Sequence, residues 1–526
     1  MTEAPAIHTE NTLLFEGGDW DFDTLRRTHD AVEDIAVNEL GFDLYPNQVE
    51  VISSEQMLDA YAATGLPLMY RHWSFGKRFA REEALYRKGY AGLAYEIVIN
   101  ASPCISYVME ENRMPMQALV MAHAAMGHNQ FFRNNQIFRD WTDAEGILDY
   151  LAFAKAYVAR CEERYGVAAV EAVLDAAHAL MDQGVFRHPR PRHRRPGDER
   201  ERLRLRRLTA EAQDDALWRI IPGARARQHP DMDADAAAPE EGDEESVAAP
   251  DLPEENLLYF LEKHSPVLAG WQRELIRIVR VIAQYLHPQK LTKVMNEGAA
   301  TWTHYTIVHR LHEKGLIDDG ALLEILHSHA NVVMQPAFDD KRFSGMNPYY
   351  LGFHINRDIE RLCLDPTDED RHWFPDIAGC GDAVGVLREA WAAFRDESWI
   401  RQFLSPRLMR EMRLFALADR EAEPAFLEVA EIHDEAGYRR LRNLLADQYD
   451  PARMEPDIQV VGADLKGDRV LRLRHTMVDN VRLDPESRDA VLRHIKRLWG
   501  YDVSLEGLDP ATGETRYLAS TRSRRE

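Results

Sequence analysis

Apolar residues recur at helical spacing along most of the chain, and this pattern predicts a mainly α-helical protein. Within 144–165 they fall at i, i+4, i+7 and i+11, the spacing of one helix face. These residues are Ile147, Leu151, Ala154 and Val158. The segment 271–286 carries a broader apolar face, and shorter helices are expected over 56–63 and 118–125.

Alternating, β-branched runs predict a few short strands. One is expected at 95–100, between helices. Two more, 457–461 and 470–474, flank a Lys-Gly-Asp turn, and a helix is expected over 485–499. The predicted fold class is therefore mainly α with α+β character, a helical body followed by a small C-terminal α+β domain.

The chain of 526 residues exceeds one ordinary domain, and its composition changes within 187–255. Residues 187–207 hold ten arginines against three acidic residues, whereas 231–255 is acidic and rich in alanine and proline. Such stretches bury too little apolar surface to fold alone. The expected segments are an N-terminal mostly helical domain with short strands (1–186), a charged linker or insertion (187–255), a second helical domain (256–425) and a C-terminal α+β domain (426–526).

The formal net charge of −24 argues against nucleic acid as a general partner, because phosphate would be repelled. The arginine-rich stretch 187–207 could bind RNA or anionic lipid, but a solvated tether is the favoured interpretation. The four cysteines contain no Cys-x-x-Cys pair, which argues against a thiolate zinc site or a disulfide framework. No run of about 18 apolar residues and no secretory leader is present, so a cytoplasmic protein without a membrane span is expected.

The first candidate site is the string His123-Ala-Ala-Met-Gly127-His128-Asn129. Imidazole is a common metal ligand, but residues five apart on a regular helix point about 140° away from each other. Gly127 could end or distort the helix and bring His128 round towards His123. The alternative is one core histidine and one capping histidine. No glutamate follows His123, so the zinc motif His-Glu-x-x-His is absent.

The second candidate is Asn296-Glu297-Gly-Ala-Ala with His304. Glu297 and His304 are seven residues apart and share a helix face, but about 10.5 Å of helix axis separates them. A division of labour is therefore expected, with Glu297 as metal ligand or base and His304 behind the ligands or on substrate. The alternative is a glutamate favoured by the helix dipole and a core histidine.

Two further groups could line a pocket. His329 is followed by a Gln335-Pro step and an Asn347-Pro step, which are turn formers. The loop between them either contributes to a site or is a structured helix connection. His72-Trp-Ser-Phe-Gly-Lys either lines a substrate groove or forms a buried turn.

Many strings of the chain, in one consistent order from about residue 19 to about residue 506, resemble those of a single protein family. They include Tyr45-Pro-Asn-Gln-Val-Glu-Val-Ile, Ala94-Tyr-Glu-Ile-Val-Ile-Asn, Ala122-His-Ala-Ala-Met-Gly-His-Asn, Met295-Asn-Glu-Gly, His329-Ala-Asn-Val-Val-Met-Gln-Pro and Leu498-Trp-Gly-Tyr-Asp-Val. On these strings the chain resembles the SpoVR (stage V sporulation protein R) family, in its longer, Gram-negative type.

That resemblance implies a link to sporulation, the peptidoglycan cortex or stress physiology. It also implies two partners, a PrkA-like serine kinase and a second protein encoded beside it. The fold is expected to be metallopeptidase-like, with the layout of a two-histidine, one-glutamate zinc site. By this likeness His123, His128 and Glu297 are the ligands of a divalent metal, with zinc the first expectation. The same likeness implies that further residues are neighbouring or substrate-facing groups: Asn129, Asn296, His304, His329, Gln335, Asn347 and His72.

Two functions from different classes remain open. One is a metal-dependent amide hydrolase, for which Glu110, Glu111 or Glu274 could be the general base and nothing in the sequence selects among them. The other is a non-enzymatic regulator or scaffold acting with the kinase. The phosphate loop, the dinucleotide fingerprint and the serine-hydrolase elbow are absent, which weighs against those enzyme classes. Convergence of His123, His128 and Glu297 in one place would favour the enzyme.

Overall fold

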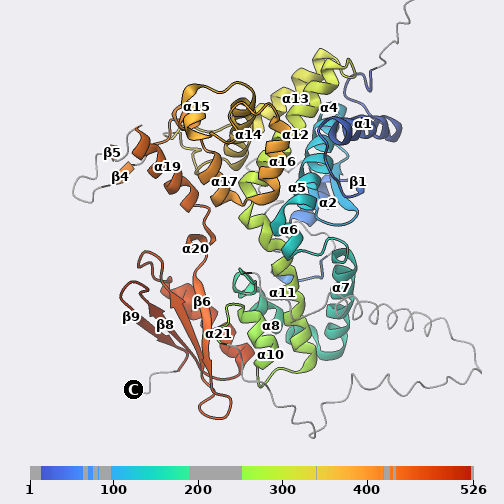
Figure 1. Ribbon diagram of the computed structural model, residues 1–526. Helices are drawn as coiled ribbons and strands as arrows, with labels where there is room; N and C mark the ends of the chain where they lie inside the picture. The colour runs from blue at the N-terminus through green and yellow to red at the C-terminus, as the bar shows by residue number, and fades with distance from the viewer. Residues whose placement is uncertain are drawn as a thin grey trace, which may run out of the picture.

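The computed structural model describes residues 13–62, 69–74, 77, 81, 96–188, 252–338, 340–415, 417–419, 427–429 and 434–522. Helices dominate these residues and three small sheets accompany them, which confirms the mainly α fold with α+β character (Figure 1). Most of the predicted linker, residues 189–251, lies outside the described residues. Among the helices that are described, none has the length and apolar character needed to cross a membrane.

Buried side chains form two hydrophobic cores. Most helices around the first core lie in the upper part of Figure 1, and most of those around the second lie in the lower part. The first core is surrounded by α1 (Phe22–Asp34), η1 (Ile35–Glu39), α4 (Met114–Val120), η2 (Met121–His128), α5 (Asn129–Asn134), α6 (Gln136–Trp141), α12 (Lys293–Glu313), α13 (Asp319–Val332), α14 (Pro348–Leu364), α15 (Asp368–Trp373), α16 (Ala383–Ala393), α17 (Asp396–Phe403), α18 (Pro406–Glu411) and α19 (Glu435–Asp447). The second is surrounded by α2 (Ser54–Ala62), α7 (Ile147–Tyr165), α8 (Val167–His178), α10 (Leu257–His264), α11 (Gly270–Leu291) and α21 (Pro485–Trp499). Both cores therefore combine segments from before and after the charged stretch.

A three-stranded sheet lies between the cores, with the order β1 (Asn47–Ile52), β3 (Cys104–Met109), β2 (Glu96–Ile99). The central strand β3 runs parallel to β1 and antiparallel to β2, and it is buried along its whole length. Successive side chains of a strand point to opposite faces. Accordingly, Cys104 and Val108 belong to the first core, and Ile105, Tyr107 and Met109 belong to the second. The strand predicted at 95–100 is β2, whereas β1 and β3 were not predicted.

The C-terminal region has the predicted α+β character. Strands β6 (Asp457–Ala463), β7 (Leu471–Thr476), β8 (Val503–Leu508) and β9 (Thr515–Ser520) form one sheet in that order, and α21 connects β7 to β8. Both strands expected at 457–474 and the helix expected at 485–499 are present, the helix with the predicted bounds. The Asp484 side chain accepts a hydrogen bond from the Ser487 N–H and begins this helix.

Helix α12 is held between η2 and α14 by contacts between backbones. A Cβ atom on Gly127 of η2 would lie 2.5 Å from the Cα atom of Ala300 in α12. A Cβ atom on Gly298 of α12 would lie 2.5 Å from the Cα atom of Gly352 in α14. Real Cβ atoms do not come this close, so glycine is required on both faces. These two contacts thus hold α12, and with it Glu297, close against both neighbouring helices.

The start of α12 is fixed by a carboxylate from another helix. The two oxygens of Asp396, the first residue of α17, accept the N–H groups of Val294 and Met295, both at 2.8 Å. The first N–H groups of a helix have no partner within the helix, so a buried acceptor here stabilises α12. Asn296 and Glu297 come directly after Val294 and Met295. The cap therefore also holds the backbone from which these two side chains extend.

Replacing Gly298 with alanine should destabilise the protein. The added methyl group would meet the backbone of Gly352, which cannot move aside as a flexible side chain would, and overpacking of this kind costs about 1–3 kcal/mol. The matched control is Gly270→Ala at the start of α11, where no atom lies within 4 Å of the new methyl group. Thermal unfolding of both variants measures the difference. Equal midpoints would show that the contact between α12 and α14 does not limit stability.

Candidate metal centre

The two histidines of the first candidate string lie on a π-helix. Residues 121–128 form η2, which continues α4 and runs on into α5 without a break. Hydrogen bonds of a π-helix run from i to i+5, so residues five apart lie about one turn apart on the same side. The rings of His123 and His128 are 4.7 Å apart between centroids. A regular helix would separate them, but this helix is wound more widely, so the distortion that the sequence interpretation left open is present. Gly127 lies within this turn and does not end the helix.

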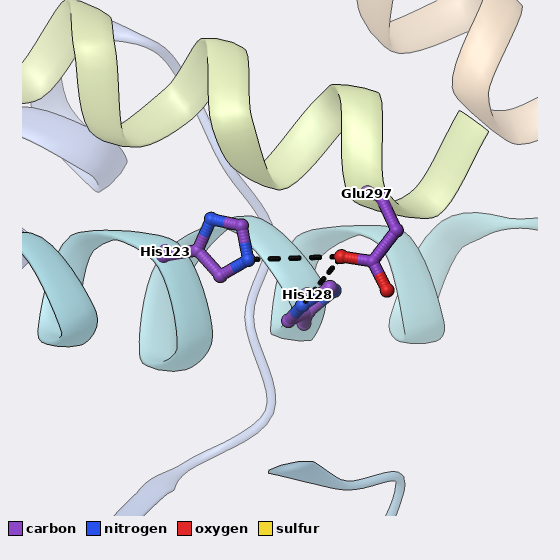
Figure 2. A group of neighbouring side chains, drawn as sticks. All are labelled: His123, His128 and Glu297. Carbon is purple, nitrogen blue, oxygen red and sulfur yellow. Dashed lines mark ion pairs between the residues drawn. The ribbon is translucent and has the colours of Figure 1, made fainter. Parts of the chain in front are cut away.

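Glu297 reaches the same point from α12. Its Oε2 atom lies 3.8 Å from His123 Nε2 and 3.7 Å from His128 Nε2, as Figure 2 shows. The three ligand atoms lie within 4.8 Å of one another, and this is the one group of its kind among the described residues. The structure therefore brings together the three side chains that the sequence resemblance named.

These three atoms fit a shared metal ion. His123 Nε2 and Glu297 Oε2 are buried and have no hydrogen-bond partner, which is costly for a polar atom. The separations of 3.7 and 3.8 Å are too long for hydrogen bonds. They are close to the roughly 3.3–3.6 Å between neighbouring ligands of a tetrahedral zinc ion with bonds of about 2.0–2.2 Å. Two imidazoles and one carboxylate are also a donor set that zinc and non-haem iron accept.

His128 is held with its free nitrogen towards this point. Its Nδ1–H donates to Asn296 Oδ1 at 2.9 Å, which leaves the Nε2 lone pair facing Glu297. Burial lowers the pKa of His128 to about 4, so the ring is neutral and able to bind a cation. Asn296 thus has the supporting position that the sequence interpretation gave it, beside a ligand.

His123 is oriented by a chain of two more histidines. Its Nδ1 lies 3.0 Å from His304 Nδ1, and His304 Nε2 lies 2.8 Å from His329 Nδ1. If His123 Nε2 keeps its lone pair for a metal, His123 Nδ1–H must donate to His304, and His304 Nε2–H must then donate to His329. This requires neutral rings. Burial lowers the pKa of His304 well below its usual value and that of His329 to about 4.

The local charges favour a cation at the Nε2 atom of His123. Burial lowers the pKa of His123, but the carboxylates of Glu297 and Glu96 raise it by more, so the net shift is upward. For Glu297, burial raises the pKa, and the neighbouring side chains of His123, His128 and Tyr349 lower it by more, so the net shift is downward. Two largely buried carboxylates, with side chains 17% and 18% exposed, thus face one point, which a divalent ion would neutralise.

The sequence interpretation missed Glu96. It is the first residue of β2, and its Oε1 atom lies 3.7 Å from His123 Nε2. The three glutamates considered as general base lie elsewhere: Glu110 and Glu111 are exposed beyond the end of β3, and Glu274 pairs with Arg277 of α11. One signal in the sequence could have pointed to Glu96. It is a charged residue at the start of a strand in which alternate side chains point into a core.

Tyr349 was also missed as a site residue. It is the second residue of α14, and its ring stacks against His123 with centroids 6.4 Å apart. The Tyr349 side chain is also one of the groups that lower the pKa of Glu297. Asn347 and Gln335 place it indirectly. Asn347 Oδ1 accepts the Tyr349 N–H at 3.0 Å, and Gln335 Oε1 accepts the Asn347 N–H at 2.7 Å.

The other predicted residues have different surroundings. Gln335 and Asn347 bond to the loop that precedes α14, which corresponds to the structured-loop alternative. Asn129 follows His128 but accepts the Tyr45 N–H and donates to Asn47 Oδ1. His72 contacts Ser74 and, on α8, Asp175 and His178, beside the second core. The structure does not bring these side chains to the three ligand atoms.

Comparison with known proteins matches nearly the whole chain to two family models. One, described as SpoVR like protein, matches residues 19–454, and the other, described as SpoVR-like C-terminal domain, matches residues 456–510. The chain belongs to the SpoVR family. Its family relative YcgB of Escherichia coli (strain K12), an uncharacterized protein, is 48% identical over 510 residues, which cover 96% of each chain. No solved structure matches this SpoVR-family chain.

Removing any of the three ligands should abolish metal binding by this SpoVR-family protein. We expect about one transition-metal ion per chain after expression in metal-replete medium, and a large loss in His123→Ala, His128→Ala and Glu297→Gln. The control is His312→Ala, because His312 lies on the same helix as Glu297 but pairs with Asp319 at the surface. Elemental mass spectrometry of folded protein measures this. Equal metal content in the ligand variants and wild type would contradict the assignment.

Replacing His304, which supports His123, should lower the affinity for the metal but leave the site occupied at a high metal concentration. His304→Ala removes the acceptor that fixes the tautomer of His123, and loss of such a partner weakens metal binding by about 10–100-fold. Competition with a chromogenic chelator gives the dissociation constant. An unchanged constant in a folded variant would show that His304 only fills the core.

Proposed function

We propose that this SpoVR-family protein is a metal-dependent hydrolase of amide bonds. In this proposal His123, His128 and Glu297 hold a divalent ion, for which zinc is the first expectation, and Glu96 is the general base. The observation that supports it best is the convergence of three ligand atoms, two of them buried without a partner, with a further buried carboxylate beside them. A bound ion of this kind polarises a carbonyl group and activates water.

Glu96 is better placed as a base than as a fourth ligand. It lies outside the group whose ligand atoms are within 4.8 Å of one another, yet its Oε1 is 3.7 Å from the nitrogen of His123 that faces Glu297. A water molecule beside the ion would be within its reach. Burial raises the pKa of Glu96, and the charge of Glu297 adds to this, while His123 opposes it. A carboxylate of raised pKa can take a proton from water and return it to a leaving amine.

Glu297 and Glu96 would then have different functions because their surroundings differ. The pKa of Glu297 is lowered, which keeps it ionised as a ligand, whereas the pKa of Glu96 is raised. A pair of carboxylates with opposite shifts is typical of sites that separate charge stabilisation from proton transfer. Tyr349 would add a hydroxyl next to Glu297, able to donate to an oxygen that gains charge.

The substrate class comes from the family resemblance. A link to sporulation and the peptidoglycan cortex favours a peptide or a peptidoglycan precursor, and both contain amide bonds. The alternative is a scaffold that acts with a PrkA-like serine kinase and its operon neighbour, in which the metal would be structural. Assays of hydrolysis by the zinc-loaded protein and by its Glu96→Gln variant separate these two proposals.

Glu96→Gln should lose turnover and keep the metal. We expect hydrolysis to fall by about 10²–10⁴-fold, because glutamine cannot accept the proton, while the three ligands remain. Zinc-loaded protein is incubated with peptide and muropeptide libraries, and mass spectrometry follows the products. Glu111→Gln is the control, since this glutamate is exposed beyond β3.

Three results would count against this function. Loss of the metal in Glu96→Gln would make Glu96 a ligand rather than a base. Unchanged turnover in that variant would place the base elsewhere. Absence of turnover by metal-loaded wild type across both libraries would favour the scaffold.

A further inference from the structure

Two cysteines that are apart in the sequence lie next to each other at the end of α14. Cys363 is the penultimate residue of this helix and is 1% exposed, whereas Cys380 is exposed on the loop that follows α15. Both are free thiols. The other two cysteines of the chain, Cys104 and Cys161, are buried in different cores.

Backbone hydrogen bonds on both sides of Cys380 hold it against the helix. The Gly379 N–H donates to Leu362 O at 2.9 Å, and the Gly381 N–H donates to Cys363 O at 3.0 Å. Both glycines have positive φ angles, +76° and +79°, which a side chain would disfavour. The loop thus satisfies carbonyl groups in the last turn of α14. It fixes the backbone of Cys380 beside that of Cys363.

The fold places the two cysteines next to each other, because the residues on both sides of Cys380 donate to the carbonyl groups of Leu362 and Cys363. Burial first, and then the neighbouring Cys380 thiol, raises the pKa of the Cys363 thiol to about 12, so Cys363 is protonated at rest. Only Cys380 is accessible to an oxidant in solution. An exposed thiol beside a second thiol is the arrangement in which oxidation ends in a disulfide.

We propose that Cys363 and Cys380 are a reversible oxidation site that forms an intramolecular disulfide when the protein meets a peroxide. The Cys380 thiol first loses its proton, and the thiolate attacks one peroxide oxygen. The O–O bond breaks to give a sulfenic acid and hydroxide, and the hydroxide takes up the released proton as water. The Cys363 sulfur then attacks the Cys380 sulfur. The S–S bond forms, the S–O bond breaks, and the departing hydroxide takes the Cys363 proton as water. In total, two thiols and one hydrogen peroxide give one disulfide and two water molecules, and a dithiol reductant reverses the change.

The disulfide would fasten the C-terminal end of α14 to the loop at 379–381. The two cysteines are 17 positions apart (380 − 363), so the new bond closes a loop that contains α15. Closing a loop removes conformations from the unfolded chain and stabilises the folded one. We expect the oxidised protein to unfold at a higher temperature than the reduced protein. This site does not depend on the proposed hydrolase activity.

Peptide mapping of the folded, full-length protein tests this proposal. The protein is treated with hydrogen peroxide, alkylated with N-ethylmaleimide, digested without reduction and analysed by mass spectrometry. We expect a linked peptide pair containing Cys363 and Cys380, a mass loss of about 2 Da for the two hydrogens, and recovery of both thiols after dithiothreitol. Cys104 and Cys161, which are alkylated only after unfolding, are the internal controls. The rise in unfolding temperature should be absent in Cys380→Ser.

Other products would overturn the proposal. A sulfinic acid or an intermolecular disulfide at Cys380 in wild type, without the linked pair, would show that Cys363 does not reach it. Two free thiols after peroxide treatment would show that Cys380 does not react. Both outcomes are measured on the wild-type protein. The conclusion therefore does not depend on whether a variant with Cys363 replaced folds correctly.

Discussion

The first core and the candidate site both depend on the close approach of α12 to its two neighbours. Gly127 of η2 faces Ala300, and Gly298 faces Gly352 of α14, in each case with backbone against backbone. Close packing of this kind leaves little room for a helix to shift, since interiors are as dense as crystals of small molecules. Asp396 adds a cap that fixes where α12 begins. Together these contacts set the distance from Glu297 to the two histidines of η2.

The π-helical turn supplies the second half of the geometry. An ordinary helix would turn His123 and His128 about 140° apart, whereas the wider winding of η2 places their rings 4.7 Å apart. Single π turns are rare and are found mostly at functional sites. Here all residues of the turn are buried, and its two polar side chains are the histidines. Asn296 and the pair His304 and His329 fix the tautomers from behind, so both free nitrogens point at one carboxylate.

The sheet between the cores explains how a further carboxylate reaches this place. Because the side chains of β3 alternate between the two cores, both bodies hold the sheet in position. Strand β2 pairs with β3 and begins with Glu96, which therefore comes from a different element than any of the three ligand residues. Two buried carboxylates this close repel each other and lose their hydration. Such a site is stable when a cation lies between its ligands, which is the physical reason for proposing a metal.

The amino-acid sequence by itself determined the local elements, because periodic burial is encoded by residues close in the chain. The helices near 147–165 and 485–499 and the strands near 457–474 follow from apolar spacing and turn residues. Matching strings determined the family and directed attention to His123, His128 and Glu297. Spacing alone could not choose between metal ligands and core histidines. The π winding, the positions of Glu96 and Tyr349 and the proximity of Cys363 to Cys380 were decided only by the tertiary structure. Each depends on contacts between residues that are far apart in the chain, and no local pattern records which segments will pack together.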